Sequence, residues 1–526
     1  MKIPRQSATT RRDFLSGVSR ATVLAAVGSR LASDLGISPA FAGETPVPLH
    51  FGPLEPLVCL MQETPPERLL PLLTARIQSG TDLRQLTAAA ALANARTFGG
   101  EDYVGFHTMM ALAPAYHMSR ELPGHQQALP VLKVLYRNTR RIQEHGGRSG
   151  EVLHGVAPGD PVSPGSARTD LRKAVRDRNT DRAEQILASR AGAGPGALLD
   201  QILPTVEENS EVHRVVMPYR AWDLMELIGT EHALTLLRQS VRYCIAAEAS
   251  RQPGWDDAGI LLTRLLDQYR LMDHTPVART ADDAWVGALS QTIFSSTGDQ
   301  AAEAAADALS QGFPPSAVGE AISLAANQLI LRDHGRTPRD EVAGKPMGSV
   351  HGDSIGVHAC DSANAWRNLS RIGGDRNSIA CLILGARQVA IDRTQRGGDF
   401  LHWDPLPVKW QLDRIRSNDP AELLQETEEA IRGNLQAHAA ALVYRYGELG
   451  HAPRPVFDLM LRYAVSEDGS LHAEKYYRTV SEEFATTRDA FRWRQLIALA
   501  RVTASEYGRP APGMAEAQEL LRSVKS

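Results

Sequence analysis

Apolar residues recur along most of the chain at the three- and four-residue spacing of an amphipathic helix. One example runs from Pro66 to Ile77, with apolar positions at Leu69, Leu70, Leu72, Leu73 and Ile77. Alanine-rich runs at 83–98 and 315–331 favour helix through intrinsic propensity. Further helical spacing covers 170–190, 195–249, 257–271 and 301–309, while alternating runs of Val, Ile and Thr are nearly absent. The pattern predicts an all-α protein.

Gly- and Pro-rich stretches divide this helical pattern. Residues 141–170 contain Gly146-Gly147, Gly150 and the run from Pro158 to Ser166, which predicts a long loop. A second break at 274–281 indicates a boundary between two halves, 43–278 and 279–526.

A short motif occurs in both predicted halves. Asp102-Tyr-Val-Gly105-Phe-His107 is matched by Asp353-Ser-Ile-Gly356-Val-His358 at an offset of 251. In each copy the Asp stands where a helix N-cap belongs, and the Gly favours close helix packing. Internal repeats of this kind point to duplication.

A longer match without gaps lies downstream. Residues 195–220 and 420–445 share seven identities at an offset of 225, and four of these pairs carry chemistry: Asn209 and Asn434, His213 and His438, Tyr219 and Tyr444, Arg220 and Arg445. Leu153-His154 also matches Leu401-His402 at an offset of 248. These matches predict an internally duplicated protein with two halves related by a pseudo-two-fold axis.

Three histidines in each half therefore occupy matched positions, and these six are the candidate metal ligands: His107, His154, His213, His358, His402 and His438. Imidazole is the commonest side-chain ligand of Zn, Cu, Fe and Ni. The set is compatible with a tris-histidine centre in each half, with one shared dinuclear centre, or with axial ligation of a haem. The alternative is that each imidazole is a hydrogen-bonded core residue. His117 and His351 are weaker candidates on neighbouring helix turns.

The remaining matched residues are assigned supporting roles. Asn209 and Asn434 are predicted one helical turn before their histidines, where they orient an imidazole or bind substrate. They are candidate catalytic residues together with Tyr219 and Tyr444. Arg220 and Arg445 are candidate cofactor-binding residues, because a guanidinium suits an anionic group. The structural alternative is that these side chains tie helices together.

Composition excludes several classes. The net charge of −4 gives no indication of the basic surface that nucleic-acid binding needs. The sequence contains no run of about 18 apolar residues, so no membrane span is predicted. The four cysteines form no CxxC pair, although an oxidising compartment would permit disulfides. The chain also lacks the motifs of dinucleotide-binding, P-loop, Ser-hydrolase and HExxH metalloprotease proteins, and the Glu-x-x-His signature of carboxylate di-iron bundles.

The N-terminus resembles a twin-arginine (Tat) export signal. Thr9 to Leu15 contains Arg11-Arg12 and Phe14, a weakly apolar stretch follows, and Ala40-Phe41-Ala42 matches a signal-peptidase site. The resemblance implies a leader at 1–42, a periplasmic or secreted mature chain and a net charge of about −8 after cleavage. The Tat route carries folded proteins, often with an inserted cofactor, which favours a metal or haem.

The stretches from Phe106 to His117 and from His358 to Arg367 resemble the His-led helices of the questin oxidase-like family. That resemblance implies helical proteins that insert oxygen into aromatic ketones with a reduced nicotinamide donor. We therefore predict an exported oxidoreductase with a histidine-bound Fe or Cu ion or haem, a small-molecule substrate and an electron-transfer partner. The alternatives are a non-catalytic periplasmic binding protein and a metal-dependent hydrolase.

Overall fold

The computed structural model describes residues 47–160, 163–255, 257–273 and 277–522. The predicted Tat leader at 1–42 lies outside these residues. The described residues from Leu49 onward belong to one compact unit. The predicted halves pack within this unit, and their origin by duplication stays a prediction.

The all-α prediction is confirmed: the described residues contain helices and two isolated bridges, without a strand. In the first part of the chain the helices are α2 (Glu55–Glu63), α3 (Pro66–Gln78), α4 (Leu83–Phe98), α5 (Tyr103–Glu121), α6 (Ala128–Glu144), α7 (Pro164–Arg176), α8 (Thr180–Arg190), α9 (Pro195–Val206), α10 (Val212–Ile228), α11 (Ala233–Ala247) and α12 (Asp257–Gln268).

The second part contains α13 (Asp283–Ser295), α14 (Gly298–Ser310), α15 (Pro315–Arg332), α16 (Ile355–Ile372), α17 (Asp375–Arg396), α18 (Lys409–Leu412), α19 (Pro420–Arg432), α20 (Gln436–Glu448), α21 (Arg454–Ser466), α22 (His472–Thr486), α23 (Trp493–Glu506) and α24 (Met514–Arg522). Short 3₁₀ turns lie at Gly52–Leu54, Gly124–Gln126, Gly147–Gly150, Ala191–Ala193, Thr230–His232 and Glu248–Ser250.

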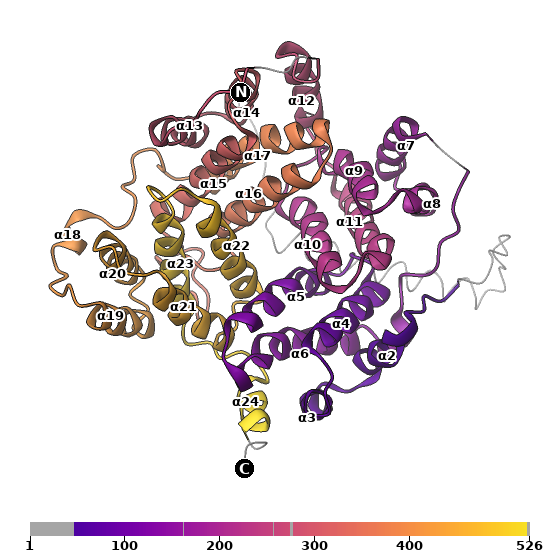
Figure 1. Ribbon diagram of the computed structural model, residues 1–526, viewed down its shortest axis with the longest axis horizontal. Helices are drawn as coiled ribbons and strands as arrows, with labels where there is room; N and C mark the ends of the chain where they lie inside the picture. The colour runs from indigo at the N-terminus through magenta and orange to yellow at the C-terminus, as the bar shows by residue number, and fades with distance from the viewer. Residues whose placement is uncertain (1–46, 161–162, 256, 274–276, 523–526) are drawn as a thin grey trace, which may run out of the picture. The chain divides into compact units, whose positions relative to one another are not determined.

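Four helices from both parts of the chain form the centre of the fold. Helix α10 packs on α5 and α16, and α22 packs on the same two helices. The labels of these four helices surround the middle of Figure 1. Outer helices cover them: α4 and α6 pack on α5, and α15 and α17 pack on α16.

Close helix contacts explain the glycines of the repeated motif. A Cβ on Gly105 would lie 2.5 Å from the Phe98 ring, and one on Gly356 would lie 2.9 Å from Ile330. The predicted packing role of both glycines agrees with these distances. Asp102 caps α5 as predicted, because its carboxylate accepts from the Gly105 N–H at 2.7 Å.

Two local predictions were wrong. Ser354, and not Asp353, caps α16, because Arg336 and Lys345 hold the Asp353 carboxylate. The helices predicted at 170–190 are present as α7 and α8, which are separated at Arg178, with a left-handed φ of 54°, and at Asn179, which caps α8. The loop at 141–170 is shorter than predicted, because α6 ends at Glu144 and α7 begins at Pro164.

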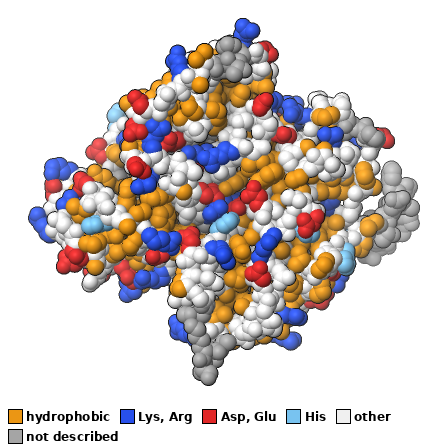
Figure 2. All heavy atoms as spheres, viewed as in Figure 1, with side chains coloured by type: hydrophobic (Ala, Val, Ile, Leu, Met, Phe, Trp, Pro, Cys, Tyr) orange, Lys and Arg blue, Asp and Glu red, His pale blue; other side chains and the backbone are white. Residues whose placement is uncertain are grey.

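Acidic and basic side chains are mixed with apolar ones over the face in Figure 2. Within the described residues, no helix is both long enough and apolar enough to cross a bilayer. All four cysteines are free thiols.

Candidate functional site: a centre of four histidines

Four imidazoles, each near the start of its helix, meet between the four central helices. They belong to His107 on α5, His213 on α10, His358 on α16 and His472 on α22. The Nε2 atoms of His107 and His213 lie 3.3 Å apart, and those of His358 and His472 lie 3.1 Å apart. We call this set the histidine centre.

The two pairs lie side by side, so each of the four rings contacts two others. Ring centroids lie 4.9 Å apart for His107 and His213, and 5.2 Å apart for His358 and His472. Between the pairs, the separations are 6.1 Å for His213 and His358 and 5.3 Å for His107 and His472. Each ring therefore has a neighbour on both sides.

Hydrogen bonds at the opposite ring nitrogen fix three of these imidazoles. The His107 Nδ1–H donates to the Tyr103 carbonyl at 2.7 Å, and the His472 Nδ1–H donates to the Gly469 carbonyl at 3.3 Å. The His213 Nδ1–H donates to the Glu211 carboxylate at 3.2 Å. A proton at Nδ1 of a neutral imidazole leaves a lone pair at Nε2, which is the nitrogen that faces the centre.

Burial keeps two of the histidines neutral. His107 and His472 are 3% and 4% exposed. Burial, followed by the charge of Lys475 and the neighbouring imidazoles, lowers the pKa of both well below the usual value. Both rings are therefore unprotonated near neutral pH, which is the form that binds metals.

A carboxylate and a phenol lie behind His213. Burial acts to raise the pKa of Glu211, but the charge and hydrogen bonds of His213 outweigh it and hold that pKa at about 2. Glu211 also caps α10 and bonds the Tyr243 hydroxyl, whose pKa is raised well above its usual value by burial and then by Glu211. Burial, and then Glu211, raises the pKa of Asp392 well above its usual value.

Aromatic rings from the first turn of α5 cover one side of the centre. The Phe106 ring stacks on His107 at 4.9 Å, and the Tyr103 ring lies 4.4 Å from His107. Tyr103 is 48% exposed, so this side of the centre is separated from solvent by a single side chain.

The donor atoms are arranged as two contacting pairs. In the described part of the chain, no three His, Cys, Asp or Glu groups are placed so that they could hold a metal ion.

His107, His213 and His358 are the predicted ligands that the structure brings together. The other three lie elsewhere. His154 lies in the loop before α7, and His402 is 79% exposed and bonded to Asp399. His438 is half-buried on α20. The predicted pairing of His213 with His438 was wrong for this centre, because α20 packs on α19 and α23.

His472 takes the place predicted for His438, and the sequence reasoning missed it. His213 follows His107 by 106 residues, and His472 follows His358 by 114. This similar spacing was a signal, but it contains a gap of eight residues, which an ungapped comparison cannot detect.

The two asparagines are not one helical turn before their histidines. Asn209 lies in the turn before α10, and Asn434 lies in the turn before α20 with a left-handed φ of 52°. The Asn434 amide donates to the Ala504 and Tyr507 carbonyls, which ties this turn to the end of α23. These contacts are those of a turn residue, because asparagine tolerates that backbone conformation.

Tyr219 and Arg220 lie in a buried network further along α10. The Tyr219 hydroxyl donates to Glu482 at 2.9 Å, and Arg220 pairs with Asp223 at 3.1 Å. The same network includes His117, whose imidazole lies 3.2 Å from Asp223. A pocket of about 420 Å³ lies beside it.

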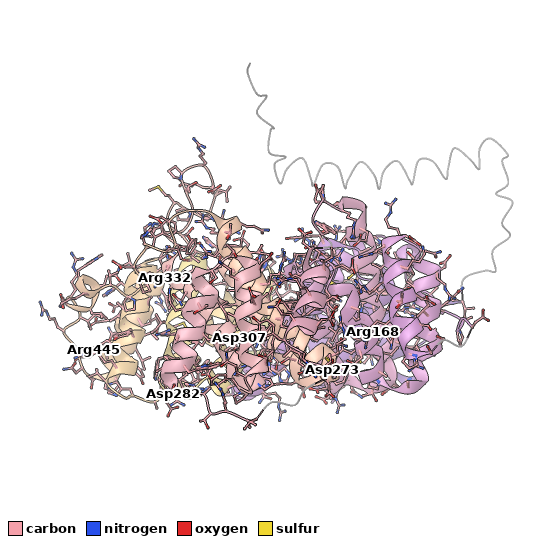
Figure 3. All side chains as sticks on the ribbon, turned by 90° about the horizontal axis from the view of Figure 1, so that it is seen from above. Arg168, Asp273, Asp282, Asp307, Arg332 and Arg445 are labelled. Atoms are coloured by element: carbon pink, nitrogen blue, oxygen red, sulfur yellow. The ribbon has the colours of Figure 1, made fainter. Side chains whose placement is uncertain are left out.

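Their predicted counterparts are remote from this network. Arg445 pairs with Glu448 and Asn418 near one edge of the unit, as Figure 3 shows, and the neighbouring Tyr444 is half-buried on α20. His351 is buried beside Glu506 and Arg509, outside the histidine centre.

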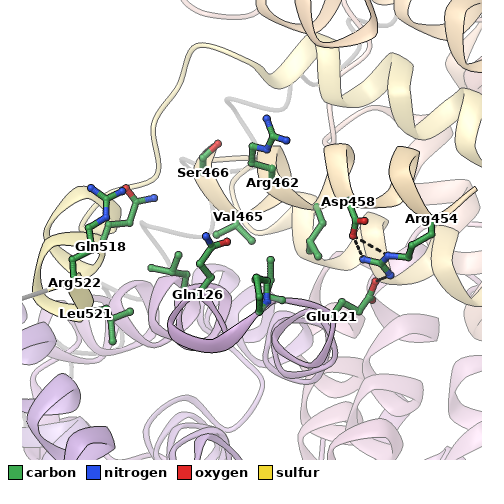
Figure 4. Close-up of a pocket in the computed structure, with 14 residues that line it drawn as sticks. Glu121, Gln126, Arg454, Asp458, Arg462, Val465, Ser466, Gln518, Leu521 and Arg522 are labelled. Carbon is green, nitrogen blue, oxygen red and sulfur yellow. Dashed lines mark hydrogen bonds and ion pairs between the residues drawn. The ribbon is translucent and has the colours of Figure 1, made fainter. Parts of the chain in front are cut away.

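A groove of about 800 Å³ lies away from the histidines, between the end of α5 and helices α21 and α24. In Figure 4 its walls carry Arg454, which is paired with Glu121 and Asp458. Arg462 of this groove pairs with Glu428 outside it, and the described residues that line the groove include no histidine or cysteine. We therefore place the candidate chemistry at the histidine centre.

Comparisons with protein-family models, with curated proteins and with solved structures found no match. The resemblance to the questin oxidase-like family stays a prediction.

Proposed function

We propose that the protein is an exported oxidoreductase that binds a redox-active transition-metal ion, Fe or Cu, at the histidine centre. The observation that carries the proposal is the contact between His107 and His213. Both donate from Nδ1, so two lone pairs face each other at 3.3 Å when both rings are neutral. A metal ion between the nitrogens relieves the repulsion of these lone pairs, as does a proton on one of them, which makes the contact a hydrogen bond.

The separation also suits a metal. Bonds of about 2.0–2.1 Å place two ligand nitrogens of a tetrahedral ion about 3.3 Å apart. The two pairs, at 3.3 and 3.1 Å, match this value.

The surroundings resemble those of bound metals in general. Metal-binding histidines usually donate their second N–H to a carbonyl or carboxylate, which fixes the tautomer. The Tyr103 and Gly469 carbonyls and Glu211 supply such acceptors here. An all-imidazole set suits Cu, Fe, Zn and Ni, and of these Cu and Fe support electron transfer.

A haem is not part of the proposal. The Nε2 atoms of the two pairs lie only 3.3 and 3.1 Å apart, which leaves no room for a porphyrin between paired rings. A single ion needs only the space between the rings.

The test is metal analysis of protein that carries no histidine tag, purified after export, combined with absorption and electron paramagnetic resonance spectra. We expect Cu or Fe in the wild type. Alanine in place of His107, His213, His358 or His472 should abolish it.

His402→Ala and His438→Ala are matched controls, because both remove an imidazole outside the centre and should keep the metal. Wild-type protein without metal, or equal loss from the control variants, would refute the proposed centre. Zinc alone would refute redox chemistry and favour the hydrolase alternative.

A further inference from the structure

The pocket of about 420 Å³ lies between three of the four central helices, with walls from α10, α16 and α22. Two of its lining residues, Glu226 and Arg371, stand thirteen positions after His213 and His358 on the same helices. This spacing corresponds to roughly 20 Å of helix. We call this cavity the polar pocket, and it is separate from the histidine centre.

Most of the charged side chains that line the polar pocket belong to ion pairs. The pairs are Arg367 with Glu483 at 2.5 Å, Arg478 with Glu482 at 2.6 Å, and Asp223 with Arg220 at 3.1 Å. Charges that are paired in this way satisfy one another and attract a ligand only weakly.

Two lining charges of opposite sign are exceptions. The Arg371 guanidinium forms neither a hydrogen bond nor an ion pair with any described residue. Glu226 accepts from the Trp222 indole N–H at 2.9 Å, and it forms no ion pair in the described part of the chain. The polar pocket therefore offers one cation on α16 and one anion on α10.

Two buried side chains of the lining each leave one polar atom without a partner. Asn364 is 1% exposed, and its Nδ2 donates to Glu483 at 2.9 Å, but its Oδ1 accepts no hydrogen bond from the described residues. Arg367 is 4% exposed, and its Nε finds no acceptor there either. Buried polar atoms without a partner are unfavourable, so a ligand that supplies one donor and one acceptor would be stabilised.

Apolar surface lies beside these polar groups. Trp222 and Ile372 are half-buried in the lining of the polar pocket. The bond to Glu226 holds the indole ring in place next to the anionic group. An aromatic face with a few polar groups around it is typical of pockets for small molecules.

We propose that the polar pocket binds an α-amino acid with an apolar side chain. The ligand carboxylate accepts from Arg371 and from the Arg367 Nε, and the ligand ammonium donates to Glu226 and to the Asn364 Oδ1. The ligand side chain contacts Trp222. A neutral ligand would leave both unpaired charges without a partner, and a simple anion or cation would satisfy only one of them. The inference does not depend on the proposed metal centre.

The experiment is isothermal titration calorimetry of the full chain with L-leucine, L-methionine and L-phenylalanine. Isocaproate is leucine without its ammonium, isoamylamine is leucine without its carboxylate, and glucose is a neutral polar probe. The variants are Arg371→Gln and Glu226→Gln. Arg416→Gln and Glu516→Gln are the matched controls, because both residues are exposed, form no ion pair within the described residues and lie outside the lining of the polar pocket.

We expect the wild type to bind leucine at least about tenfold more tightly than isocaproate or isoamylamine, because each analogue loses one charged hydrogen-bonding group. Arg371→Gln should weaken leucine binding by a similar factor and leave isoamylamine binding unchanged. Glu226→Gln should weaken leucine binding and leave isocaproate binding unchanged. Both control variants should bind leucine as the wild type does.

The proposal would be overturned if none of the three amino acids binds at millimolar concentration, or if leucine binds no more tightly than its two analogues or glucose. Equal weakening in the control variants would also overturn it. The comparison of leucine with its analogues uses the wild type, so it decides the question even if a variant fails to fold. Leucine binding by protein that contains no metal would support the polar pocket and refute only the proposed function.

Discussion

Glu211 is the residue at which a small change should have a large effect on the histidine centre. Its Oε2 accepts from the His213 Nδ1–H at 3.2 Å, and its Oε1 accepts from the Arg214 N–H at 2.8 Å. In Glu211→Gln an amide oxygen at the Oε1 position keeps the cap bond from the Arg214 N–H, whereas the bond from the His213 N–H to Oε2 at 3.1 Å is lost. The amide nitrogen, however, cannot accept from His213 and instead donates to Nδ1.

The expected consequence is a change of tautomer. When Nδ1 accepts, the proton of neutral His213 moves to Nε2, where it blocks metal binding. Loss of such a supporting contact typically reduces metal affinity about 10- to 100-fold, or roughly 1.4 to 2.8 kcal/mol. We expect a loss in this range for Glu211→Gln.

The assay is competition for the metal with a chelator of known affinity, at pH 7 and at fixed salt. Asp419→Asn is the matched control, because Asp419 caps α19 through two backbone N–H groups and has no histidine partner. Both variants lose one carboxylate at a helix start. If Glu211→Gln binds the metal as tightly as Asp419→Asn, the tautomer argument is wrong.

Three further predictions concern stability. Burial acts to raise the pKa of Asp223, but His117 and Arg220 outweigh it and hold that pKa at about 2, so the ionised carboxylate should stabilise the fold above its unfolded pKa of 3.8. In urea titrations Asp223→Asn should therefore be less stable than the wild type by about 1–3 kcal/mol at pH 7. This difference should shrink as the pH falls from about 4 toward 2. A deficit that is constant with pH would contradict this. Gly105→Ala should destabilise the protein by about 1–3 kcal/mol, because the added Cβ would lie 2.5 Å from the Phe98 ring. Gly287→Ala should instead stabilise α13 by about 0.5–1 kcal/mol, because the nearest neighbour of the added Cβ is 3.7 Å away. Shifts of the denaturant midpoint in the same direction for both variants would disprove the packing argument. Removal of the metal with a chelator should lower the melting temperature, and added metal should restore the original value, because an ion that binds only the folded protein stabilises the folded protein. A melting temperature that does not change with metal would contradict a metal site in the folded protein.

The sequence by itself determined the helices. Spacing of Leu and Ile, alanine-rich runs and capping residues are local signals, and α4 begins and ends at the predicted residues, Leu83 and Phe98. The Asp102 cap and the close packing at Gly105 were predicted from the same short stretch. Local patterns failed at the start of α16, where Arg336 and Lys345 hold the predicted cap Asp353 and Ser354 caps the helix.

The sequence also identified His107, His213 and His358 as candidate ligands, but only the tertiary structure shows which imidazoles lie together. His438 matches His213 in its surroundings along the chain, yet α20 lies against α19 and α23, and α22 instead brings His472 to His358. A match between two segments records similar neighbours in sequence and contains no information on where each helix packs. The packing position of each helix depends on the apolar faces of many helices at once. This packing brings three predicted histidines and one that was not predicted into a single centre.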